Sequence, residues 1–128
     1  GGNDVTKYDT DKPIYLQIID RITKQIIRGD IKPGDKLPSV REMAIQSEVN
    51  PNTVQRTYQE MERMGMVETR RGQGTFVTEN NTVLIQLKVE MEKQVIERFI
   101  NGMRELGVED QNIVHSVQMF LKGGEDRD

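Results

Sequence analysis

Apolar residues recur at helical spacing near the start of the chain. Between residues 14 and 28 they fall three and four positions apart, as one face of an α-helix requires, at Ile14, Ile18, Ile19, Ile22, Ile26 and Ile27. Gly29 fits the position just past a helix end, where a left-handed backbone is common. Residues 30–38 are rich in turn formers, so the pattern predicts a first helix followed by a connecting loop.

Two helix-start signals follow this loop in close succession. Ser39 and Glu42 match the capping box, in which each side chain bonds the backbone N–H of the other residue. Asn50 is a favourable N-cap, and Pro51 fits the first helical position, where a missing N–H costs nothing. We therefore expect a short helix from Ser39 and a third helix from Pro51 to Met64. Because only about three residues join them, they predict a helix-turn-helix.

A hairpin is predicted directly after the third helix. Residues 66–70 and 75–78 are short β-prone runs, and residues 71–74 between them contain two glycines. Such a hairpin beside a helix-turn-helix is a candidate wing. The turn of the helix-turn-helix holds Glu48 where glycine is common, and a positive φ there would strain a non-glycine residue.

The remaining chain has the pattern of two amphipathic helices. A long one begins beyond Asn80 and breaks at Gly107, and a last one is capped by Asp110 and ends before Gly123. Two such helices cannot enclose a core alone, so we expect a two-fold dimer. Its predicted contact residues are Leu84, Leu87, Met91, Val95, Phe99 and Met103. The alternative is that the long helix packs only within its own chain.

Composition narrows the possible classes of protein. The chain has 128 residues, no cysteine and one histidine, His115, which excludes disulfides and thiolate metal sites and argues against histidine-based catalysis. We predict no catalytic residues, no metal and no cofactor, and we interpret His115 as a partly exposed helix residue. No apolar run is long enough for a membrane helix, and no secretory pattern precedes the first helix. We therefore expect a cytoplasmic protein without a membrane partner.

Charge does not by itself indicate nucleic-acid binding. The chain has 18 basic and 21 acidic residues, a formal charge of -3, and residues 36–78 contain six basic and five acidic residues. Binding to DNA must then depend on local placement. The acidic residues gather toward the far end of the third helix, which leaves a local basic face of Arg41, Arg56, Arg70 and Arg71.

Residues 13–77 resemble the winged helix-turn-helix domain of the GntR family of bacterial transcription regulators. The resemblance covers about half of the chain and is carried in order by residues 33–44, 49–54, 65–67 and 71–77. The run VNPNTV at residues 49–54, with about fifty residues after the wing, is similar to the short YtrA-type subfamily.

The resemblance implies a mainly α fold with a small β-hairpin. It places the winged helix-turn-helix in residues 12–79 and a helical dimerisation segment in residues 80–123. Residues 124–128 are expected to form a frayed tail. We treat Gly1-Gly2-Asn3 as a cloning or cleavage remnant, because it has neither an initiating Met nor packing content, and expect residues 1–11 to be mobile.

The start of the third helix suits contacts with phosphates. It presents free N–H groups and the positive end of the helix dipole, and one turn further Gln55 and Arg56 can reach base edges in the major groove. The resemblance implies that Arg41 and Gly74 lie against DNA. The full predicted DNA-binding set is Ser39, Arg41, Asn50, Asn52, Thr53, Gln55, Arg56, Arg70, Arg71, Gly72, Gln73, Gly74 and Thr75.

Ordinary structural roles compete with this interpretation. Arg56 and Arg63 could pair with Glu60 and Glu62 at helical spacing, and the motif context favours DNA for Arg56 only. Arg70 and Arg71 could be a hairpin edge kept soluble by charge. We expect Tyr58 and Phe76 to be core residues rather than parts of a ligand cage.

The combined prediction is a homodimeric, sequence-specific DNA-binding regulator on a palindromic operator of double-stranded DNA, bound to the bacterial nucleoid. Repression is favoured over activation, since bound protein can obstruct the polymerase. The alternative is a protein-interaction module with a degenerate winged scaffold. An enzyme is not expected, because no nucleophile, base and oxyanion set is visible. The sequence leaves open whether a small-molecule effector exists.

Overall fold

The computed structural model describes residues 11–126, with side chains described as far as residue 123. Residues 1–11, which were expected to be mobile, lie outside the described residues apart from Asp11. The expected remnant Gly1-Gly2-Asn3 also lies outside them. The chain divides into two compact units, Gly1–Lys88 and Val89–Asp128. The boundary falls within a helix rather than before it, where the sequence analysis placed the end of the DNA-binding domain.

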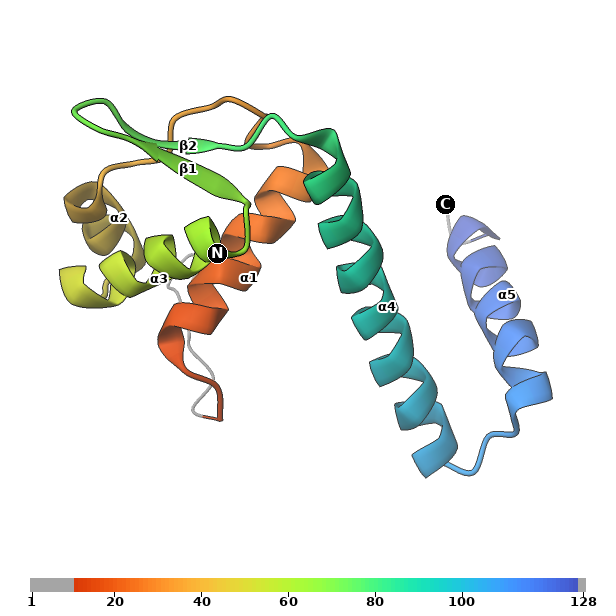
Figure 1. Ribbon diagram of the computed structural model, residues 1–128. Helices are drawn as coiled ribbons and strands as arrows, with labels where there is room; N and C mark the ends of the chain where they lie inside the picture. The colour runs from red at the N-terminus through yellow and green to blue at the C-terminus, as the bar shows by residue number, and fades with distance from the viewer. Residues whose placement is uncertain (1–10, 127–128) are drawn as a thin grey trace. The chain divides into compact units, whose positions relative to one another are not determined.

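The first unit is a winged helix-turn-helix, as predicted. Three helices, α1 (Ile14–Arg28), α2 (Val40–Ser47) and α3 (Pro51–Arg63), lie beside an antiparallel hairpin of β1 (Val67–Arg70) and β2 (Gly74–Val77) (Figure 1). These elements bury one apolar cluster, because each supplies one hydrophobic face. The cluster consists of Ile18, Ile19, Ile22, Ile26, Leu37, Met43, Ala44, Val54, Tyr58, Met61, Met66, Val67 and Val77.

The predicted helix caps at α2 are present. The Ser39 hydroxyl accepts from the Glu42 N–H at 3.1 Å, and the Ser39 N–H donates to the Glu42 carboxylate at 2.9 Å. Glu48 ends α2 with φ 57°, the one non-glycine residue with positive φ among residues 11–126. The expected strain is therefore real, and it is the local condition for the tight turn into α3.

The loop before α2 does more than connect two helices. The N–H groups of Gly34 and Leu37 donate to the carbonyls of Val77 and Thr75 at 2.9 and 2.8 Å, and the Val77 N–H donates to Asp35 at 2.8 Å. The loop thus lies along β2 and fixes the base of the wing. The turn formers of residues 30–38 predicted only a connector, and this role of the loop was not expected.

Two further helices follow the wing, α4 (Asn81–Glu105) and α5 (Asp110–Asp126). The prediction that the last helix ends before Gly123 was wrong, since two glycines near a helix end cost only about 1 kcal/mol each. The prediction that Asp110 caps α5 also needs correction. Asp110 is its first helical residue, and its carboxylate pairs with Arg104 at 2.8 Å. Within the described part of the chain no helix is long and apolar enough to cross a membrane.

Candidate nucleic-acid interface

Helix α3 has an inward face that packs in the core and an outward face that is polar. Val54 and Met61 are completely buried, with Thr57 and Tyr58 beside them. The opposite side of the helix therefore presents Asn52, Gln55, Arg56 and Gln59 to solvent, and Thr53 is half-buried at its edge. Gln59 was not in the predicted set, although it stands seven positions after Asn52 and so two turns along the same face.

The expectation of free N–H groups at the start of α3 was wrong. Pro51 has no N–H, and the Asn52 N–H donates to the Asn50 side chain at 2.7 Å. The N–H groups of Thr53 and Val54 donate to the Asn50 carbonyl at 2.9 and 3.3 Å. Contacts with phosphate at this end must therefore come from side chains and from the helix dipole.

Arg41 is exposed on the first turn of α2, and the start of that helix is fastened to α3. The buried Tyr58 hydroxyl donates to the Pro38 carbonyl at 2.7 Å, immediately before the N-cap. Ser39, in the predicted DNA-binding set, uses its hydroxyl to cap α2. Its side chain thus sets the position of Arg41 whether or not it touches DNA itself.

The arginines of α3 have different partners. Arg63 pairs with Glu60, its Nε lying 3.0 and 3.1 Å from the two carboxylate oxygens, so the ion-pair interpretation is confirmed for Arg63. Glu62 instead accepts from the Thr69 N–H of the wing at 3.0 Å. The Arg56 guanidinium lies over the ring of Tyr15, 4.0 Å from its centroid. Arg56 therefore has an aromatic partner and not the carboxylate that was considered for it.

The wing combines an exposed glycine-containing turn with a packed stem. Arg70 lies 4.2 Å from the centroid of the half-buried Phe76 ring and donates to Glu68 at 2.7 Å. At the tip, Arg71, Gly72 and Gln73 are exposed. Arg70 thus supports the stem, whereas Arg71 is the arginine that projects.

Gly74 shows why the wing needs glycine at its second strand. Its φ is 123°, a region that L-residues rarely adopt, and a Cβ there would lie 2.7 Å from Cε of Lys36. The far end of the Lys36 side chain therefore lies against Gly74 of the wing. Lys36 is a cation of this surface that was left out of the predicted set, because the loop along β2 that brings it there was not foreseen.

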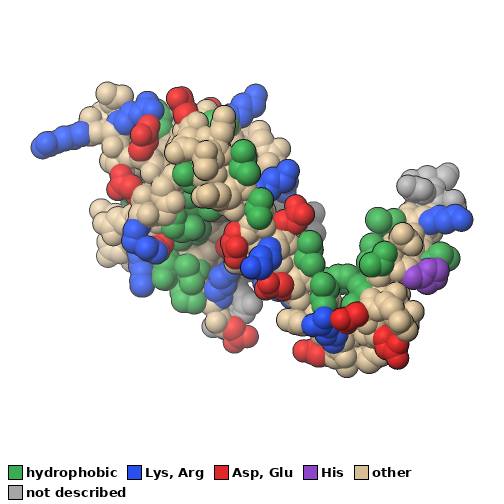
Figure 2. All heavy atoms as spheres, turned by 45° about the vertical axis from the view of Figure 1, so that its right-hand side comes forward, with side chains coloured by type: hydrophobic (Ala, Val, Ile, Leu, Met, Phe, Trp, Pro, Cys, Tyr) green, Lys and Arg blue, Asp and Glu red, His purple; other side chains and the backbone are tan. Residues whose placement is uncertain are grey.

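On this surface two of the carboxylates are held by hydrogen bonds, whereas several of the cations have no ion-pair partner. The backbone N–H and hydroxyl of Ser39 hold the pKa of Glu42 below its usual value, and the hydrogen bond from Arg63 does the same for the pKa of Glu60. These carboxylates are ionised and engaged at neutral pH. Within residues 11–126, no ion pair involves Lys36, Arg41, Arg56 or Arg71. Figure 2 shows basic and acidic side chains interspersed rather than one uniform patch.

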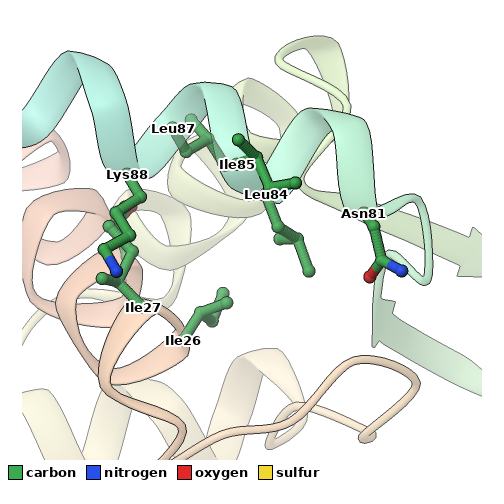
Figure 3. Close-up of a pocket in the computed structure, with 8 residues that line it drawn as sticks. Ile26, Ile27, Asn81, Leu84, Ile85, Leu87 and Lys88 are labelled. Atoms are coloured by element: carbon green, nitrogen blue, oxygen red, sulfur yellow. The ribbon is translucent and has the colours of Figure 1, made fainter.

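The predicted dimer residues fall into two groups. Leu84 and Leu87 are half-buried and pack against the core of the first unit. They line a hollow of about 290 Å³ between α1 and the start of α4 (Figure 3), with Thr23, Ile26, Ile27, Asn81, Ile85 and Lys88. In the second unit, Val95 and Phe99 are 59% and 42% exposed, and Met91 and Met103 are half-buried. Intrachain packing therefore accounts for the first group only.

A capped helix pair with an exposed polar face, followed by a hairpin that carries a projecting arginine, defines a winged helix-turn-helix DNA-binding protein. Residues 14–77 match the family model of "Bacterial regulatory proteins, gntR family". The chain belongs to this family of transcriptional regulators, and the resemblance noted in the sequence is confirmed.

Relatives of nearly the same length have been identified in Bacillus subtilis (strain 168). The chain is 52% identical to an uncharacterized HTH-type transcriptional regulator, YhcF, over 92% of this chain and 98% of the relative. It is 42% identical to the HTH-type transcriptional repressor YtrA over 91% and 92% of the two chains. A solved GntR family regulator from Listeria monocytogenes is 42% identical, with a TM-score of 0.80 over 88% of this chain and 98% of that one. These relatives are short regulators rather than enzymes.

Proposed function

We propose that this DNA-binding regulator is a homodimeric repressor that recognises a palindromic operator. The exposed polar face of α3 between Arg41 and the wing carries the proposal, because exposed cations without an ion pair and long hydrogen-bonding side chains occur together there. Similarity to the repressor YtrA supports the direction of regulation. A chromosomal operator would place the protein in the bacterial cytoplasm.

In this proposal α3 enters the major groove. Gln55 and Arg56 have the length and donors to read adenine and guanine edges, and Gln59 extends the same face by one turn. Asn52 and Thr53 contact the backbone near the helix start, where the dipole is positive. Arg41 binds the flanking phosphates.

The wing contributes at the adjacent backbone or minor groove. Arg71 and Gln73 project from its tip, and the open space around Gly72 allows the turn to approach a phosphate closely. Lys36 adds positive charge where its side chain lies against Gly74. Arg70 acts indirectly, by holding the stem against Phe76.

A second copy of the chain would cover the apolar surface of the second unit. Val95, Ile96 and Phe99 of α4 are 59%, 47% and 42% exposed, and Phe120 of α5 is 78% exposed. A nearly wholly apolar hollow of about 420 Å³ lies beside Phe99 and Phe120 and is lined by Phe99, Met103, Ser116, Val117, Phe120 and Leu121. Exposed apolar surface on this scale marks an interface, and a two-fold pair would place two α3 helices on one side of a duplex.

Fluorescence anisotropy with DNA from upstream of the protein's own gene tests the proposal. The wild type should bind a fragment with an inverted repeat, and its affinity should fall steeply with salt. Arg41→Ala should weaken binding, whereas Arg98→Ala, which removes an exposed charge from the second unit, should not. Binding that is absent, or that survives Arg41→Ala unchanged, would refute the proposed surface.

Oligomeric state is measured separately by analytical ultracentrifugation. The expected species has twice the chain mass of 14.7 kDa, and Phe99→Glu should convert it to monomer while leaving the first unit folded. A monomeric wild type at micromolar concentration would exclude the dimer. If replacing Arg70 and Arg71 together left the regulatory function of the protein unchanged, the protein-interaction alternative would be favoured instead.

A further inference from the structure

Arg56 is held by an aromatic ring from another helix. Tyr15 is the second residue of α1, and its ring is half-buried against the core cluster. The Arg56 guanidinium carbon lies 4.0 Å from the ring centroid, well inside the range in which a cation is attracted by the face of an aromatic ring. The partners are far apart in sequence and meet because α1 packs against α3.

The neighbouring acidic side chain does not compete for Arg56. Glu60, one turn further along α3, is engaged by Arg63 through Nε and Nη2. Arg56 is close enough to help lower the pKa of Glu60, although the hydrogen bond from Arg63 is the larger cause. The Tyr15 ring is therefore the partner that fixes the Arg56 side chain in the described part of the chain.

Stacking on a ring leaves the donors of a guanidinium available. The five N–H groups of arginine lie in the plane of the group, whereas the ring occupies one face of that plane. The contact limits the conformations of a long, exposed side chain without consuming the hydrogen bonds needed to read a base. A carboxylate partner in the same place would accept hydrogen bonds from the guanidinium N–H groups, and DNA would have to displace it.

We propose that Tyr15 is a positioning residue that presents Arg56 to a base edge in the major groove, so that α1 contributes to operator specificity. The inference rests on the proposed function, since it assigns a role within the same DNA-binding surface. It predicts that the aromatic ring, rather than the hydroxyl, is what the position requires.

The test is a double-mutant cycle in the full-length protein, read as operator affinity. Tyr15→Leu should weaken binding about three- to tenfold, the fold-change that corresponds to ordering one long side chain on binding, and Tyr15→Phe should stay within about twofold. In an Arg56→Ala background, Tyr15→Leu should have no further effect. Equal losses in the two backgrounds, or a loss in Tyr15→Phe as large as in Tyr15→Leu, would overturn the proposal.

A second readout separates positioning from a general effect on folding. Operator affinity is measured with each base pair substituted in turn, and Tyr15→Leu and Arg56→Ala should relax discrimination at the same base pair. In a separate thermal melt, Tyr15→Phe should leave the melting temperature unchanged. Relaxation at no position would overturn the inference. If the wild type does not bind the operator at all, the proposed function itself fails, whereas a silent Arg56→Ala with intact wild-type binding refutes only the role of this pair.

Discussion

Removing the hydroxyl of Tyr58 tests how the two helices of the motif are fixed to each other. The side chain is 7% exposed, and its hydroxyl donates to the Pro38 carbonyl at 2.7 Å. Tyr58→Phe preserves the ring and its packing but leaves that carbonyl without its donor. The hydrogen bond that links α3 to the residue before the start of α2, close to Arg41 in sequence, is then lost.

The expected loss of stability follows from the environment of the bond. An intramolecular hydrogen bond contributes about 0.5–1.5 kcal/mol net, and a buried acceptor left unsatisfied costs about 1–3 kcal/mol. Pro38 is half-buried, so water can partly replace the donor. We therefore expect a loss of about 1–1.5 kcal/mol, or about 3–5 °C in melting temperature for a chain of this size.

The same substitution should change the alkaline limb of the stability curve. Burial raises the pKa of Tyr58 well above the ordinary value of 10.0. The unfolded chain thus loses this proton at lower pH than the folded one, and the stability contributed by the protonated hydroxyl falls as the pH rises above 10.0. The wild type should lose stability there faster than Tyr58→Phe.

Urea unfolding at one fixed protein concentration measures these effects, because the stability of the proposed dimer would depend on protein concentration. Tyr15→Phe is the matched control, since the Tyr15 hydroxyl makes no hydrogen bond within residues 11–126. The control should change stability by less than about 0.5 kcal/mol. Equal stabilities for Tyr58→Phe and the control would refute the reasoning.

Three further substitutions probe the backbone and the cap. Glu48→Gly should stabilise the protein by about 0.5–1 kcal/mol, since φ 57° strains an L-residue; a lower melting temperature would contradict this. Gly74→Ala should destabilise by about 1–3 kcal/mol and weaken operator binding, and should do more harm than Gly72→Ala at the open tip. Hydrogen bonds from Ser39 lower the pKa of Glu42 below 4.5, so its stabilisation is complete above pH 4.5 and lost as the pH falls further. Glu42→Gln should flatten that acid limb in thermal melts, and an unchanged limb would count against it.

Features set by local chemistry were predictable from the sequence. The capping box at Ser39 and the left-handed Glu48 depend on residues within a few positions, so their patterns were sufficient. The occupied N–H groups at the start of α3 followed from the same Asn50 and Pro51 that predicted the helix start. That error lay in treating a capped helix end as though its donors were free.

Features set by tertiary packing were not predictable. Lys36 reaches the wing only because its loop bonds along β2, and Arg56 meets Tyr15 across the α1–α3 contact. From helical spacing alone, Arg56 and Arg63 could each form an ion pair with the same acidic residues. In the folded chain Glu60 pairs with Arg63, and Arg56 lies over the ring of Tyr15.

Hydroxyl-radical footprinting of the upstream DNA tests most directly whether two copies of this surface dock on one duplex. The expected pattern is a pair of protected half-sites related by two-fold symmetry, with centres about 34 Å or a multiple of that distance apart, and flanking protection that disappears when Arg71 is replaced by alanine. A single asymmetric footprint, or uniform protection independent of sequence, would contradict the central claim.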